Sequence, residues 1–229
     1  MTEKFQKIKE VGEKELNQSK DSTHDMDHVM RVYNLAMTIA KSESGVNMDI
    51  LQAAVLLHDI GGAKESMDPS GQTDHAIVGA EMAKPILESF GFSNDDIKHV
   101  QACILSHRYR TENKPETIEA KIVHDADKLD AAGAIGLARS FSWIGKHKAK
   151  IYKKVDSIED YIKENLTEGK INGRIMDKSK HSVWINYETK EKFLVDNLYT
   201  ETAKKIGKER MIYFKDFLDR IDREVAGEL

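Results

Sequence analysis

The sequence contains a single cysteine, Cys103, in 229 residues, so no disulfide framework within the chain is possible. Proline is also rare, with three residues, and the alternating β-branched pattern that is typical of strands is nearly absent. Apolar residues instead recur at steps of three and four along most of the chain. This pattern predicts an all-α fold.

The chain also lacks a strong net charge and long apolar runs. The formal charge is −4, from 35 basic and 39 acidic residues, which is too small and too mixed to favour binding of duplex nucleic acid. The longest apolar runs, such as Ala53–Leu57, are too short to span a bilayer, and Met1–Lys4 has no apolar signal core. We therefore expect a cytoplasmic, globular protein without membrane contact.

The most informative stretch is Leu56–Gly62, where an apolar helix from Ile50 runs into adjacent histidine and aspartate residues and then meets two glycines. A buried, charged Asp59 beside the buried imidazole of His58 is costly unless something pairs with both, and a divalent cation does so. Taken alone, the pair would fit an exposed helix end equally well. The rest of the chain favours the metal.

Two further polar side chains point inward from other predicted helices. His28 shares a stripe with Val32 and Ile39, and Asp127 shares a face with Ala120 and Val123. Side chains from facing helices are how a helical bundle builds a metal site in its core. The alternative is that each of these residues is a hydrogen-bonded polar group of the core. Two imidazoles and two carboxylates would suit Mn, Fe, Co, Ni or Zn, with Mg also possible.

The remaining elements are predicted from caps and helical periodicity. Asp21 or Ser22 caps the helix of His28, a loop follows Gly62, and Pro115 begins the helix of Asp127. A helix capped by Asp74 is expected to bury His75, Val78, Gly79, Met82 and Ile86, and the next helix to bury Ile97, Val100, Ile104 and His107. A last helical region is expected from Tyr187 to near Ala226.

The order His28, then His58-Asp59, then Asp127 resembles the HD-domain superfamily of metal-dependent phosphohydrolases. The stretch Asp125–Phe141 further resembles a bacterial branch of predicted HD hydrolases, some of them nucleotide pyrophosphohydrolases. The resemblance implies an HD-type helical bundle, with metal ligation by His28, His58, Asp59 and Asp127. We expect one all-α domain over residues 1–229, with the metal-binding core in 21–143 and a helical C-terminal part, 144–229, packing on that core.

The expected chemistry is hydrolysis of a phosphoester or phosphoanhydride in a small substrate, by implication a nucleotide. A bound divalent ion lowers the pKa of its water by several units and makes a nucleophile available near neutrality. Negative phosphate needs cationic partners, for which the candidates are Arg31, Lys64, Arg108, Lys128 and Arg139. Arg31 ranks first because it lies one helical turn from His28. Lys128 ranks second, with a salt bridge behind the metal ligands as its alternative role. We assign catalytic roles to Asp59, Arg31 and Lys128.

His75 and His107 could either hold a second ion or contact phosphate. We predict one firmly held metal, with substrate bound by Arg31, His75, His107, Arg108 and Lys128. Two rival functions stay open: a catalytically inactive regulatory protein that binds metal and nucleotide, and a di-iron oxygenase, which would need His75 and His107 as ligands. The sequence leaves the oligomeric state open, a homodimer included.

Overall fold

The computed structural model describes residues 1–18, 25–108, 113–171 and 173–229. In these residues all regular elements are helical, and the backbone pairing between extended segments is limited to two isolated bridges. The prediction of an all-α fold is therefore confirmed. No helix in the described ranges combines the length and the apolar character needed to cross a membrane. The chain forms two compact units, Met1–Leu129 with Leu198–Ala203, and Asp130–Asn197 with Lys204–Leu229.

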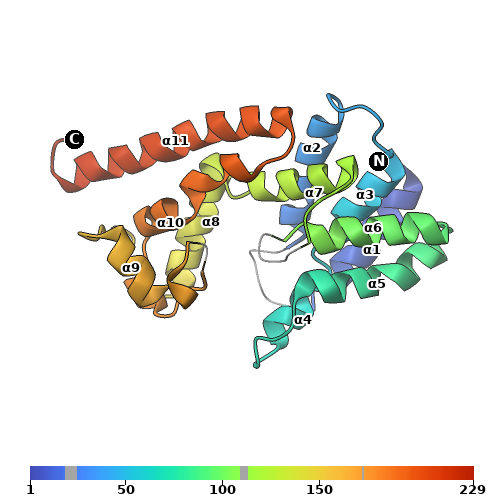
Figure 1. Ribbon diagram of the computed structural model, residues 1–229, viewed down its shortest axis with the longest axis horizontal. Helices are drawn as coiled ribbons and strands as arrows, with labels where there is room; N and C mark the ends of the chain where they lie inside the picture. The colour runs from blue at the N-terminus through green and yellow to red at the C-terminus, as the bar shows by residue number, and fades with distance from the viewer. Residues whose placement is uncertain (19–24, 109–112, 172) are drawn as a thin grey trace. The chain divides into compact units, whose positions relative to one another are not determined.

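The first unit is a bundle organised around one buried helix, α3 (Figure 1). From Ile50 to Leu57 every residue of α3 except Gln52 is buried, because α1, α2, α6 and α7 pack around it. Its helices are α1 (Glu3–Leu16), α2 (Met26–Ala40), α3 (Met48–Leu57), α4 (Gly62–Met67), α5 (His75–Ser89), α6 (Asn94–Ser106) and α7 (Ile118–Leu129).

Side-chain caps fix where several of these helices begin. Asp74 and Ser93 accept hydrogen bonds from the first turns of α5 and α6, as predicted. Asp25 caps α2, while the predicted caps Asp21 and Ser22 lie outside the described residues. The prediction that Pro115 begins α7 was wrong, because Thr117 accepts a hydrogen bond from the Ala120 backbone and α7 begins at Ile118.

The segment after the HD pair differs from the expectation in two ways. A short helix, α4, replaces the start of the predicted loop. In addition, α5 buries a stripe of mostly small residues, Ala76, Gly79, Ala80, Ala83 and Leu87, instead of the stripe with Val78, Met82 and Ile86. Small side chains let α5 approach its neighbours closely. A Cβ atom on Gly61 would lie 2.3 Å from the His75 carbonyl oxygen and 2.7 Å from the Gly79 nitrogen.

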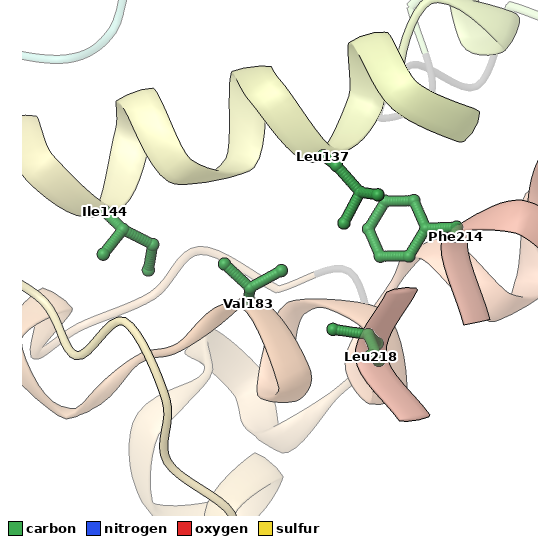
Figure 2. Packing of buried hydrophobic residues seen from close by; sticks show 5 residues of the cluster. All are labelled: Leu137, Ile144, Val183, Phe214 and Leu218. Atoms are coloured by element: carbon green, nitrogen blue, oxygen red, sulfur yellow. The ribbon is translucent and has the colours of Figure 1, made fainter. Parts of the chain in front are cut away.

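The second unit contains α8 (Gly133–Lys146), α9 (Ile158–Asn165), α10 (Val183–Thr189) and most of α11 (Glu201–Val225). Leu137 and Ile144 of α8 pack with Val183 of α10 and with Phe214 and Leu218 of α11 (Figure 2). The predicted continuous helical region from Tyr187 was wrong, because two 3-10 turns, η3 (Glu191–Phe193) and η4 (Val195–Asn197), separate α10 from α11.

Candidate metal centre

Three buried side chains of the first unit converge where α3 ends. His58 is the C-cap of α3, Asp59 follows it in the turn, and His28 reaches them from the first turn of α2. The Nε2 atoms of His28 and His58 lie 3.4 Å apart. They are 3.4 and 3.5 Å from the Oδ2 atom of Asp59. The donor atoms are thus spaced as a single metal ion would require.

Asp127, near the end of α7, adds a second carboxylate beside His28. Its Oδ1 atom is 3.4 Å from the Nε2 atom of His28, and its Oδ2 atom accepts a 2.7 Å bond from Lys128. Burial alone would raise the pKa of Asp127, but the positive charge of Lys128 and the bond with His28 hold it well below its usual range. The four side chains that the sequence predicts as ligands are therefore together, with Asp127 ionised.

The other oxygen of Asp59 faces a second pair of histidines. Its Oδ1 atom is 3.4 Å from the Nε2 atom of His75, at the start of α5, and 3.5 Å from that of His107, the C-cap of α6. These two Nε2 atoms lie 3.2 Å apart. Asp59 thus stands between two groups of donors, each able to hold a metal ion.

The hydrogen bonds of the imidazoles test whether a cation fits. The Nδ1 atom of His58 lies 2.8 Å from the Val55 carbonyl oxygen, and that of His107 lies 2.6 Å from the Ile104 carbonyl oxygen. Because a carbonyl only accepts, each Nδ1 carries a proton and each Nε2 faces Asp59, where a neutral ring presents a bare lone pair. Burial lowers the pKa of His58 to about 4, which keeps that ring neutral. Lone pairs facing a carboxylate repel one another, so a divalent cation matches this donor set.

Asp125 fixes α7 beside the site through buried hydrogen bonds. Its fully buried carboxylate accepts bonds from the backbone nitrogens of Tyr199 and Thr200 at 2.9 and 2.7 Å, and from the Thr200 hydroxyl at 2.7 Å. His124 contacts the same carboxylate and packs edge-on against Tyr199. Two residues before Asp127, α7 is thereby fixed to the segment Leu198–Ala203.

The predicted phosphate-binding cations are not all placed alike. Arg31 is half-buried on α2, Lys64 is exposed on α4, and Lys128 is bonded to Asp127. Arg108, just after α6, forms ion pairs with Glu65 and Asp74. In the second unit, Arg139 pairs with Asp130 at 2.8 Å.

Glu65 is a residue that the sequence analysis missed. It binds both Arg108 and the Nδ1 atom of His75. Its helix, α4, lies where a loop was expected, so no periodicity marked Glu65 as facing the site.

The family model of the HD domain matches residues 26–132. YpgQ of Bacillus subtilis is 26% identical over 210 residues, which are 90% of this chain and 86% of YpgQ. The 3'-5' exoribonuclease YhaM of Bacillus subtilis is 32% identical over 118 residues, a match that covers 45% of this chain but only 37% of YhaM.

The comparison of structures extends over nearly the whole chain. The crystal structure of an HD-superfamily hydrolase from Bacillus thuringiensis has a TM-score of 0.69 at 27% identity and covers 98% of this chain and 97% of its own. The crystal structure of YpgQ in complex with ADP has a TM-score of 0.69 at 23% identity and covers 96% of this chain and 94% of its own. At this identity the likeness is evidence for the fold alone. Residues 26–132 therefore match the HD domain, and the chain has the fold of bacterial HD-superfamily hydrolases.

Proposed function

We propose that this protein is a metal-dependent phosphohydrolase that cleaves a phosphoester or phosphoanhydride bond of a small nucleotide. The observation that carries the proposal is the buried convergence of the His28 and His58 imidazole nitrogens on the Asp59 carboxylate. His28, His58, Asp59 and Asp127 would hold the ion. A divalent cation held there supplies a water of lowered pKa and positive charge for the phosphate.

The chain's own residues would divide the remaining work. Lys128 keeps Asp127 ionised and adds positive charge beside the ligands. Arg31, one turn after His28 on α2, is the proposed phosphate contact, since its guanidinium can bind two phosphate oxygens. The choice of a nucleotide is supported by the complex of YpgQ with ADP.

The donor atoms of His107 and His75 favour a second ion over the predicted phosphate contact. Phosphate oxygens need proton donors, whereas a His107 ring with its one proton on Nδ1 would offer a lone pair at Nε2 and suit a cation. Asp59, His75 and His107 are therefore proposed to hold a second, separately removable ion. The same donor set keeps a di-iron oxygenase as the alternative function, which iron content together with oxygen uptake would reveal.

The test is a screen for phosphate and pyrophosphate release from nucleotides by metal-stripped protein, supplied in turn with Mn, Mg, Co and Ni. Asp59→Asn should abolish release. Asp216→Asn, at an exposed position of α11, is the matched control and should not. Metal-restored protein that binds nucleotides but releases neither product would refute the hydrolase and favour the regulatory alternative.

A further inference from the structure

We propose that Glu65 and Arg108 are positioning residues that hold His75 with its Nε2 atom directed at Asp59. The inference deepens the proposed function, on which it rests for the role of His75 at the metal. The structural feature that Glu65 and Arg108 would determine is the orientation of the His75 imidazole ring. That orientation can be measured without metal or substrate.

The need for such a device follows from where His75 lies in its helix. His58 and His107 each end a helix, and each donates its Nδ1–H to the carbonyl three residues earlier in that helix. His75 is instead the first residue of α5, so no preceding helical turn offers a carbonyl to its ring. An acceptor must come from another element.

Glu65 of α4 provides that acceptor. Its Oε2 atom lies 2.5 Å from the Nδ1 atom of His75. Because an ionised carboxylate only accepts, this bond places a proton on Nδ1 and directs Nε2 toward Asp59, so that Nε2 is bare whenever the ring is neutral. Burial opposes ionisation of Glu65, but the bond with His75 and the charge of Arg108 lower its pKa overall.

Arg108 holds the carboxylate in place. It donates to the Oε1 atom of Glu65 at 2.9 Å and to the Oδ2 atom of Asp74 at 2.7 Å. Asp74 is also the N-cap of α5, bonded to the Ala76 nitrogen. The side chain of Arg108 is 15% exposed, so these bonds are partly shielded from water. With both ends of its guanidinium engaged by carboxylates, Arg108 is better suited to fixing Glu65 than to binding substrate.

The experiment compares Glu65→Ala, Glu65→Gln and Arg108→Ala with Glu81→Ala, a matched change at an exposed site on α5. Nitrogen–proton NMR correlations of the imidazoles are recorded on metal-free protein at alkaline pH, where the rings are neutral. The wild type should show His75 protonated on Nδ1. In Glu65→Ala the His75 ring should shift toward the Nε2-protonated form, while His58 and His107 keep their patterns.

Turnover and metal affinity should fall in the same variants in which the His75 tautomer changes. Glu65→Ala should lower turnover or metal affinity about tenfold to a hundredfold, which is the usual effect of losing a residue that orients a ligand. Glu65→Gln keeps an acceptor oxygen and should recover part of the loss, and Arg108→Ala should show a smaller defect. Glu81→Ala should match the wild type.

An unchanged His75 tautomer in Glu65→Ala would overturn the positioning role, whatever the activity. If Glu65→Ala does not fold, Glu65→Leu, which also removes the acceptor, decides by the same spectrum. A tautomer shift in a protein that never turns over any phosphate compound would instead refute the proposed function and leave the positioning role standing.

Discussion

Replacing Gly61 with alanine should force α5 away from the turn that carries His58 and Asp59. The new methyl group would lie 2.3 Å from the His75 carbonyl oxygen and 2.7 Å from the Gly79 nitrogen, whereas ordinary contacts begin near 3.4 Å. Relief therefore needs a movement of 3.4 − 2.3 = 1.1 Å, and both obstacles are backbone atoms that no rotamer change can clear. Gly61 has φ −78°, which alanine adopts readily. The effect is thus steric, and overpacking of this kind costs about 1–3 kcal/mol.

The neighbouring glycine offers the matched control. A methyl group on Gly62 would meet nothing within 4 Å, and Gly62 begins α4. Gly62→Ala should leave the free energy of unfolding unchanged or raise it by up to about 1 kcal/mol. Urea unfolding followed by circular dichroism gives the stabilities, and metal analysis of the same samples shows whether the His75 ion is lost. Equal stabilities and equal metal contents in the two variants would refute the close approach of α5.

Four other predictions test the site. Asp59→Ala should abolish metal binding and His58→Ala should remove about one ion, both with loss of turnover while circular dichroism keeps the helical signal, and full metal occupancy in both would contradict the ligand assignment. Arg31→Ala should lower catalytic efficiency about tenfold to a hundredfold at unchanged metal content, since a charged contact contributes roughly 1.5–3 kcal/mol; undiminished activity would exclude a phosphate contact. His75→Ala should remove about one of two bound ions, and a native content of one ion would argue against the second site. Asp125→Asn should lower the free energy of unfolding by about 3 kcal/mol, because its buried partners are all donors; a loss below about 0.5 kcal/mol would contradict the bracing role.

Helical register was enough to bring the predicted ligands together. His28, Asp59 and Asp127 come from separate parts of the sequence, and periodicity correctly turned each toward the same interior. His107 also lies on the buried stripe of α6, as predicted. Their assignment as ligands stays a prediction.

Helical register did not predict features that depend on the close packing of backbones. Gly79 of α5 was correctly placed, but the rest of the stripe was misassigned because the sequence signal favours large apolar residues, whereas α5 buries several alanines. Glu65 was missed because its role depends on a contact in space that no sequence pattern marks. It binds the ring of His75, ten residues later, which begins its helix and has no carbonyl of a preceding turn to bind. The division into two compact units likewise depends on contacts between distant segments, which composition does not record.

The bond between Asp125 and the segment Leu198–Ala203 sets a limit on how the HD domain can be isolated by truncation. A fragment ending at residue 132, where the family match stops, would keep the Asp125 carboxylate in a buried position but lose the Tyr199 and Thr200 donors that satisfy it. A buried carboxylate without donors destabilises its surroundings, and Asp127 lies two residues away on the same helix. A minimal stable fragment of the HD domain would therefore have to carry residues 198–203 back to α7, for example through a short engineered linker.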